Sequence, residues 1–177
     1  HSDMVQVAGK YRVSFTELNL DFATVSAHKI GGPAGVGALW CKAGRRLPAI
    51  ICGGGQERGM RSGTENIAGI IGFGAAADAA ASEIEAEEIS GNLAKWHATL
   101  EQTIRAVCPE ISILSDGADR LFNTTCLALP QIASQTAIMA LDLDGVMVSA
   151  GSACSSGKVS ASHVITAMGR GDLAPYT

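Results

Sequence analysis

Lys29 follows a short apolar run and precedes a glycine-rich turn, and this placement could give its amine a chemical role. The run at residues 20–25, LDFATV, is apolar and β-branched enough to predict a buried strand, and the glycines and proline of residues 31–37 must then turn the backbone. Lys29 is therefore expected at the end of a strand. A lysine that is partly desolvated there loses its proton more readily than one in water, so its amine could attack an aldehyde.

Spacing alone leaves the role of Lys29 open, because a lysine beside glycines is more often a solvated loop residue. A phosphate-binding P-loop does not fit. In a P-loop the lysine follows the glycines and precedes Ser or Thr, whereas Lys29 precedes the glycines.

Cys154 is the second residue whose surroundings suggest chemistry. Residues 149–158, SAGSACSSGK, are small almost throughout, which predicts a mobile loop. A free cysteine is usually a small buried hydrophobe, but this segment offers no apolar neighbours that could bury the thiol. An exposed thiol on a tether of glycine and serine could act as a nucleophile.

Composition narrows the classes of partner. Of the 177 residues, 47% are hydrophobic and 17% charged, which is typical of a globular chain with one sizeable core or two small ones. A net charge of -4 without a basic run argues against nucleic acid and against an anionic membrane surface as partners. No apolar stretch is expected to span a bilayer, and the start does not resemble a signal peptide. Small molecules and other proteins remain as partners.

The five cysteines include no C-x-x-C pair, so we expect neither a disulfide framework nor a metal site, and a reducing cytoplasm is the simplest setting. The chain begins with His1 and not with methionine, so a processed or truncated chain is expected.

The order of elements predicts an α/β fold with two parts. An alanine-rich helix at 68–81 is followed by a long amphipathic helix from Ile84 to Val107, and a domain boundary is expected near Ser82. The first part, residues 1–82, is also expected to contain a short helix at 14–18. The second part, residues 83–177, is expected to hold strands at 111–114, 123–129 and 146–149 and a helix at 134–143.

The sequence from Ser26 to Leu39, SAHKIGGPAGVGAL, resembles the cofactor-lysine signature of cysteine desulfurases of the NifS/IscS type, which belong to the class V aminotransferase family. Three more blocks of this family occur in order: HSDMVQ at 1–6, GGGQERGMRSGTEN at 53–66 and GSAC at 151–154. Four ordered blocks are far more specific than one. The chain looks like roughly the C-terminal half of the family pattern without its extreme C-terminus.

The resemblance implies part of the large domain of a fold type I pyridoxal-phosphate enzyme, followed by its small α/β domain. Lys29 would then hold the cofactor covalently and move protons at the substrate carbon. Asp3 would pair with the pyridine nitrogen and keep it protonated. Gln6 would contact the ring hydroxyl.

The same resemblance implies that Ser26 and His28 hold the cofactor phosphate. Thr64 would reach the phosphate of a neighbouring subunit, which implies a homodimer. A helix expected to begin near Glu65 would give Thr64 the favourable surroundings of a helix N-terminus.

The activity implied by the resemblance is removal of sulfur from L-cysteine, which leaves L-alanine and a persulfide on Cys154. The sulfur would pass to an acceptor such as an iron-sulfur scaffold protein. Two alternatives remain: another class V enzyme, such as a selenocysteine lyase or an aminotransferase, and a non-catalytic fragment that only dimerises. The family also uses an upstream histidine, an upstream asparagine and a downstream arginine that have no counterpart here, so the chain by itself is expected to be inactive.

Overall fold

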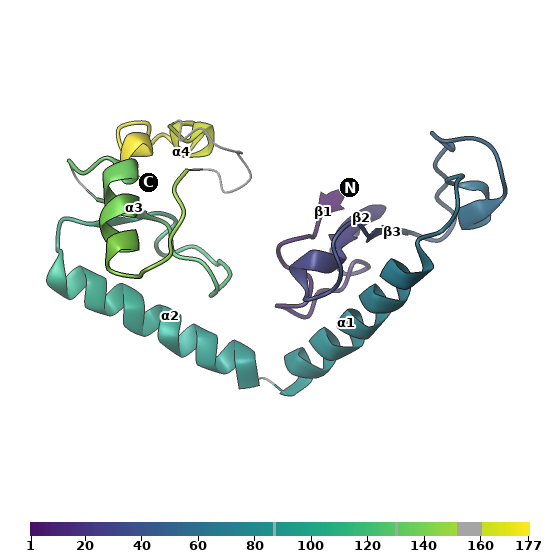
Figure 1. Ribbon diagram of the computed structural model, residues 1–177, viewed down its shortest axis with the longest axis horizontal. Helices are drawn as coiled ribbons and strands as arrows, with labels where there is room; N and C mark the ends of the chain where they lie inside the picture. Colours follow the sequence, from purple (N-terminus) through teal and green to yellow (C-terminus); the bar gives the residue numbers. More distant parts are fainter. Residues whose placement is uncertain (87, 130, 152–160) are drawn as a thin grey trace. The chain divides into compact units, whose positions relative to one another are not determined.

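The computed structural model describes residues 1–86, 88–129, 131–151 and 161–177. Contacts divide the chain into two compact units, His1–Gly91 (unit 1) and Asn92–Thr177 (unit 2). Figure 1 labels the α-helices of both units and the strands of unit 1. The boundary expected near Ser82 falls inside a helix of unit 1, whereas the contacts divide the chain after Gly91.

Unit 1 contains a three-stranded mixed sheet. Its strands are β1 (Ser2–Asp3), β2 (Phe22–Ser26) and β3 (Gly37–Cys41), in the order β1-β2-β3. β1 runs parallel to β2, and β3 runs antiparallel to it. The short 3-10 helix η1 (Ala27–Lys29) follows β2 directly, so Lys29 does lie just beyond a strand. Ala23 and Ala27 are fully buried and anchor this strand end.

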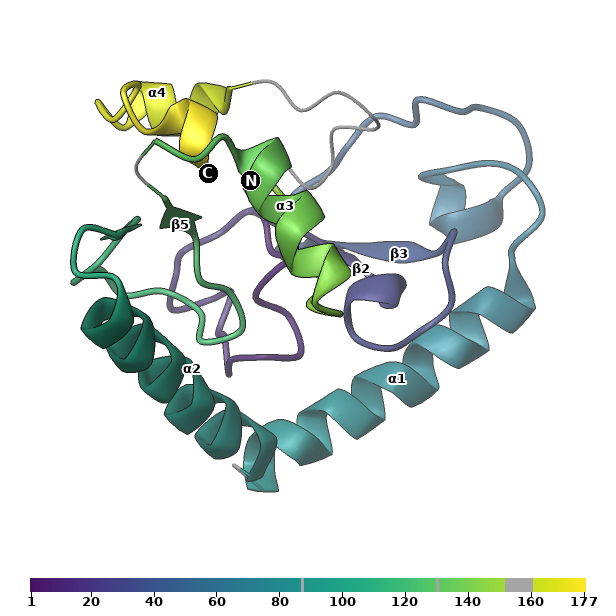
Figure 2. The same ribbon diagram turned by 60° about the vertical axis from the view of Figure 1, so that its left-hand side comes forward.

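Helix α1 (Ile67–Ala86) packs against the turn that follows η1 through small residues. A Cβ atom added to Gly32 would lie 3.2 Å from the Cβ of Ala76, and one added to Gly72 would lie 3.0 Å from the Cγ of Pro33. The alanines and glycines of α1 therefore let the helix approach the turn that carries Lys29. Figure 2 shows α1 alongside β2 and β3.

Helix α1 is also long and apolar enough to cross a membrane by length and composition, with a mean hydropathy of 1.4. The expectation that no apolar stretch could span a bilayer was therefore wrong. Core helices of soluble proteins pass the same test, so this finding by itself does not make the chain a membrane protein.

Unit 2 holds most of α2 (Glu88–Val107), and an antiparallel pair of short strands follows that helix. The elements that follow α2 in the chain are β4 (Ser112–Ile113), β5 (Leu127–Ala128), α3 (Ser134–Leu143), α4 (His163–Ala167) and the 3-10 helix η3 (Ala174–Tyr176). The core of unit 2 consists of Leu114, Ile165 and Ala174 together with the partly buried Leu173. Strands and helices in both units confirm the α/β class.

Two expected elements are not formed in the part of the chain that the structure describes. Residues 14–18 form a hydrogen-bonded turn, in which the Leu18 amide donates to the Ser14 carbonyl at 3.1 Å. Residues 146–149 are not a strand. Instead, the Val146 amide donates to the Leu141 carbonyl at 2.8 Å beyond Gly145, whose φ of 77° ends α3 in a Schellman motif.

A buried ion pair ties the loop between β4 and β5 to α2. Arg120 donates two hydrogen bonds of 2.8 Å to the Glu101 carboxylate, and the Thr125 hydroxyl donates a third of 3.0 Å. His97 Nε2 lies 3.1 Å from Glu101 Oε1. The Glu101 side chain is only 11% exposed. The hydrogen bonds from Arg120 hold the pKa of the Glu101 carboxyl below its ordinary value, although burial acts in the opposite direction.

We expect Glu101→Gln to lower the free energy of unfolding by about 3 kcal/mol at pH 7, because the substitution leaves a largely buried guanidinium without its counter-charge. Since the folded-state pKa of Glu101 is depressed, its contribution is present above the unfolded-state pKa and is lost as the pH falls through the folded-state value. The difference in stability between the two proteins should therefore shrink as the pH falls below the ordinary glutamate pKa of about 4.3, and the two should converge only below the depressed folded-state value.

Urea denaturation followed by circular dichroism measures this difference. Glu110→Gln is the matched control, because Glu110 is exposed and its substitution should change stability by less than about 0.5 kcal/mol. A Glu101→Gln chain as stable as this control at pH 7 would show that the ion pair contributes little.

Candidate active site

The first predicted site residues lie at one edge of the sheet in unit 1. Asp3 ends β1, and it lies opposite Thr24 of the parallel strand β2. Ser26 ends β2, and η1 then carries His28 and Lys29. Because parallel neighbouring strands end at the same edge of a sheet, the structure places these residues from two separate segments in one region.

Ser26 and His28 contact each other directly. The distance between Ser26 Oγ and His28 Nδ1 is 2.7 Å, which is a short hydrogen bond. The buried Ala27 between them holds the backbone, since its amide donates to the Val36 carbonyl at 3.1 Å and its carbonyl accepts from Gly32 at 2.9 Å. The structure therefore presents a hydroxyl and an imidazole as a pair, on a turn that is fixed from both sides.

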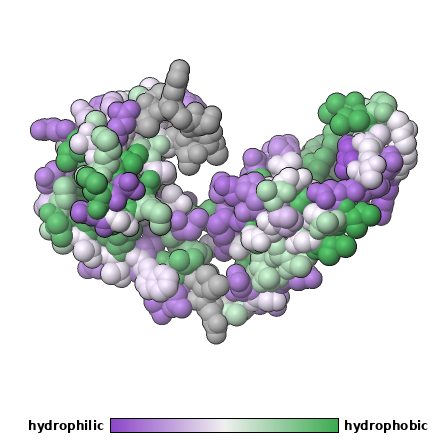
Figure 3. Space-filling view, viewed as in Figure 1, coloured by the Kyte–Doolittle hydropathy of each residue, from purple (hydrophilic) through white to green (hydrophobic). Residues whose placement is uncertain are grey.

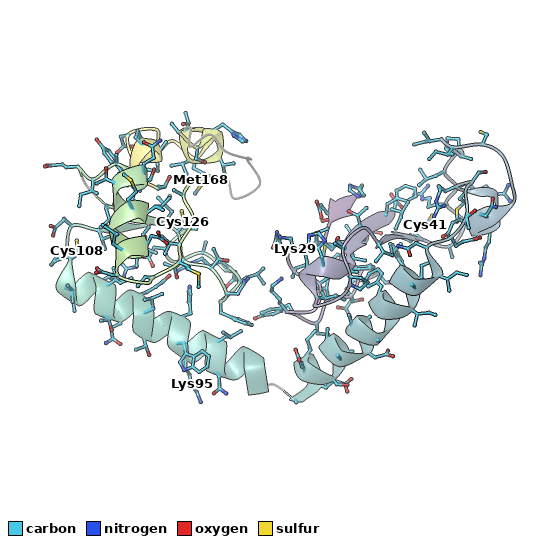
Figure 4. All side chains as sticks on the ribbon, viewed as in Figure 1. Lys29, Cys41, Lys95, Cys108, Cys126 and Met168 are labelled. Atoms are coloured by element: carbon cyan, nitrogen blue, oxygen red, sulfur yellow. The ribbon has the colours of Figure 1, made fainter. Side chains whose placement is uncertain are left out.

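Lys29 is the last residue of η1, and its side chain is exposed. Figure 4 labels it at the edge of unit 1. Among the described residues, no hydrogen bond or ion pair engages its amine. The amine is therefore available to a ligand.

Asp3 is the last residue of β1 and Gln6 lies on the turn that follows it, and both are exposed. Asp3 Oδ1 accepts a hydrogen bond of 2.9 Å from the Val5 amide, so one carboxylate oxygen stabilises the turn. The amides of Val7 and Ala8 donate to the Met4 carbonyl and close the same turn. The Gln6 carbonyl accepts a hydrogen bond of 2.8 Å from Lys10 Nζ. Lys10 is not among the site residues predicted from the sequence.

Thr64 lies apart from the helix N-terminus at which it was expected. Helix α1 begins at Ile67, and Asn66 caps it by accepting a hydrogen bond of 3.1 Å from the Gly69 amide. Thr64 is exposed and precedes this cap by two residues. In the described part of the chain, no hydrogen bond or ion pair joins Thr64 to Lys29 or to the other site residues.

The loop before Thr64 has an unusual backbone. Glu57 and Arg58 have φ values of 50° and 56°, two successive left-handed conformations that cost L-residues roughly 1 to 3 kcal/mol each. The loop is held by Ser62, whose hydroxyl donates to the Gly54 carbonyl at 2.8 Å. Strain that is maintained in this way is common at ligand-binding sites. In the sequence, the only sign of this strained loop was the mixture of glycines and charged residues at 53–63.

Cys154 lies outside the described residues, so its predicted role stays a prediction. The four other cysteines are free: Cys41, Cys52, Cys108 and Cys126. Among the described residues, no group of three or more His, Cys, Asp or Glu side chains could hold a metal ion.

Comparison with known proteins adds to this geometry. The family model described as aminotransferase class-V matches residues 1–176. A cysteine desulfurase of Bradyrhizobium diazoefficiens is 44% identical over 168 residues, which are 95% of this chain and 42% of that protein. A cysteine desulfurase of Klebsiella pneumoniae is 38% identical over the whole chain, which spans 43% of that protein.

Solved structures show the same likeness. The NifS-like protein from Rickettsia africae superposes with a TM-score of 0.86 at 37% identity, over 99% of this chain and 46% of that one. A structure described as SspA in complex with cysteine has a TM-score of 0.65 at 27% identity, over 99% of this chain and 50% of that one. The chain thus spans about half the length of these relatives or less, and by the match from residue 1 to residue 176 it belongs to the aminotransferase class-V family.

Proposed function

We propose that this chain is part of a pyridoxal-phosphate-dependent cysteine desulfurase that takes sulfur from L-cysteine. The observation that carries the proposal is the available amine of Lys29 next to the hydrogen-bonded pair Ser26 and His28, at a strand end of a chain with cysteine desulfurases among its relatives. The proposal is the activity of the whole protein, of which this chain supplies one part.

The residues present suit the cofactor in chemical type. The carboxylate of Asp3 would pair with the ring nitrogen, and the amide of Gln6 would contact the ring hydroxyl. A hydroxyl and an imidazole held 2.7 Å apart, Ser26 and His28, suit a phosphate group. Space is also available, because a Cβ atom added to Gly31 or Gly35 would meet nothing within 4 Å.

When bound, pyridoxal phosphate supplies an electron sink for bonds at the substrate α-carbon. Lys29 would hold the cofactor and would carry a proton to and from the substrate carbon. Asp3 would keep the ring nitrogen protonated. Asp3 ends β1 and Lys29 lies just beyond β2, and their place at the same sheet edge supports these roles.

Cys154 would supply the nucleophile for sulfur transfer. Its thiolate would attack the sulfur of the substrate, forming a S–S bond as the C–S bond breaks, and the carbon left behind would take a proton to become L-alanine. The resulting persulfide on Cys154 would be passed to an iron-sulfur scaffold or another acceptor protein. A cytoplasmic setting is part of the proposal, and the four free cysteines of the described residues support it.

A second copy of the protein is the proposed partner at the loop that carries Thr64. Apolar side chains are exposed on this loop and at the start of α1, and hydrophobic residues gather over this end of unit 1 in Figure 3. Ile50 is 96% exposed, and Ile51, Met60, Ile67 and Ile71 are each about half exposed or more. Exposed apolar surface of this kind favours association, and a second copy would bring Thr64 to the partner's cofactor.

We expect the 177-residue chain by itself to bind pyridoxal phosphate weakly and to turn over no cysteine. The chain spans 42% of its relative from Bradyrhizobium, and groups that position the substrate are absent, which can cost orders of magnitude in rate. The measurement is a spectroscopic titration with pyridoxal phosphate together with an assay for alanine released from L-cysteine.

The natural protein that contains this sequence in full should release alanine and sulfur in equal amounts in the same assay. Turnover by the 177-residue chain at the rate of the complete protein would contradict the idea that it is one part of the site. A complete protein that transaminates or racemises amino acids without releasing sulfur would refute the proposed function.

A further inference from the structure

A pocket in unit 1 lies between the segment that follows β1 and the C-terminal end of α1 (Figure 1). Its volume is about 260 Å³. Most of its wall is apolar, and both segments contribute side chains to it: Met4, Val7, Val13, Phe15 and Ile84. An apolar cavity of about 150 Å³ is large enough to bind benzene, so this pocket has room for a larger apolar group.

Close packing fixes the walls of the pocket. Gly9 lines it with a φ of 72°, and a Cβ atom added to this residue would lie 2.6 Å from Cγ2 of Ile30. Any larger residue there would push the two segments apart. Phe15 packs edge-on against Trp40 of β3, with the ring centroids 5.2 Å apart. Met4 is only 7% exposed. The pocket is therefore built into the packing of unit 1.

An ion pair lies at the rim of this pocket. Arg12 and Glu85 both line it, and Arg12 Nη2 lies 3.4 Å from Glu85 Oε1. Their side chains are 78% and 69% exposed, so the two charges face solvent above the apolar wall. An exposed pair with one long contact contributes little to stability, so these charges can separate and accept a ligand without a large loss.

We propose that this pocket binds a free amino acid with a medium-sized apolar side chain. The carboxylate of the ligand would pair with Arg12, its ammonium group with Glu85, and its side chain would occupy the pocket. An apolar cavity with a few polar groups that fix orientation is the usual form of a small-molecule site. A ligand with a single charge would leave either Arg12 or Glu85 unpaired, whereas a zwitterion pairs with both.

The proposal does not rest on the proposed function. The residues assigned to the cofactor are all described by the structure, and none of them lines the pocket.

Titration of the 177-residue chain with L-leucine, followed by NMR of isotope-labelled methionine methyl groups, tests the proposal. Met4 lines the pocket, and Met139, which is 61% exposed on α3 of unit 2, is the internal reference. The Met4 signal should move and saturate with a dissociation constant on the order of 1 mM, because so small a ligand makes few contacts. The Met139 signal should stay in place. A Met4 signal that does not move at about 20 mM leucine would overturn the proposal.

Two analogues separate the charges of the ligand. L-leucinamide lacks the carboxylate and isocaproate lacks the ammonium group, so each should bind about tenfold more weakly than leucine. Arg12→Gln should remove the preference for leucine over leucinamide, and Glu85→Gln should remove the preference for leucine over isocaproate. Arg105→Gln is the matched control and should keep both preferences, because Arg105 forms a partly exposed ion pair with Asp116 in unit 2. Equal binding of leucine and both analogues by the unsubstituted chain would refute a zwitterionic ligand.

Ala81→Leu tests whether the ligand occupies the pocket itself. Ala81 lines the pocket from α1, and leucine is a good helix former, so this chain should fold while its affinity for leucine falls at least about fivefold. Ala79→Leu should leave the affinity unchanged, since Ala79 is exposed on the same helix and does not line the pocket. Leucine binding that Ala81→Leu leaves intact would contradict the assignment of this pocket.

The natural protein that contains this sequence in full should show the same response of Met4 to leucine. A Met4 signal that moves in the 177-residue chain but not in the complete protein would show that another segment of that protein fills the pocket, and this result would also overturn the proposal.

Discussion

Replacement of Lys29 by alanine is expected to abolish covalent attachment of pyridoxal phosphate and to reduce cysteine turnover by the complete protein at least about a hundredfold. The reason is that, in the proposed function, the amine on η1 would be both the anchor and the group that moves protons at substrate carbon. Visible absorption of the bound cofactor and alanine release are the two measurements.

Lys95→Ala is the control for this experiment. Lys95 is exposed on α2, and alanine is compatible with a helix at that position. Its absorption and turnover should match those of the unsubstituted protein. A Lys29→Ala protein that retained covalently bound cofactor would show that another lysine is the anchor.

Replacement of Cys154 by serine is expected to abolish sulfur transfer in the complete protein while cofactor attachment stays intact. A hydroxyl at this position is a far weaker nucleophile than a thiolate, and it cannot hold a persulfide. Persulfide detection on the protein, together with the cofactor absorption, separates the two effects.

Cys52→Ser is the matched control, since Cys52 is a free, exposed cysteine of unit 1 whose thiol donates to the Ala49 carbonyl at 3.5 Å. This protein should transfer sulfur normally. Unchanged transfer by Cys154→Ser would mean that a different cysteine, or none, accepts the sulfur.

Elements with strong local signals could be predicted from the sequence. The β-branched run before Lys29 became β2, and the periodic run at 134–143 became α3 with the expected bounds. The strand expected at 146–149 was wrong, because a strand needs a partner and Gly145 instead favours a Schellman motif at the end of α3. Local pattern does not say which segment will pair with which.

The site was predictable to a similar degree. Ser26 and His28 meet because they are close in sequence, whereas the close approach of Gly9 to Ile30 joins segments 21 residues apart. The pair formed by Glu101 and Arg120 was missed for the same reason, since 19 residues separate its partners. Thr64 was expected at the start of a helix, but Asn66 caps that helix. The sequence does not decide between neighbouring capping residues, because the choice depends on backbone geometry.

The identity of the cofactor lysine is tested most directly by reducing the complete, cofactor-loaded protein with borohydride and mapping the modified peptide by mass spectrometry. We predict a single phosphopyridoxyl group on Lys29, in the peptide that also contains Ser26 and His28. A modification on Lys10, Lys42 or any other lysine, with Lys29 unmodified, would contradict the assignment of this strand end as the active site.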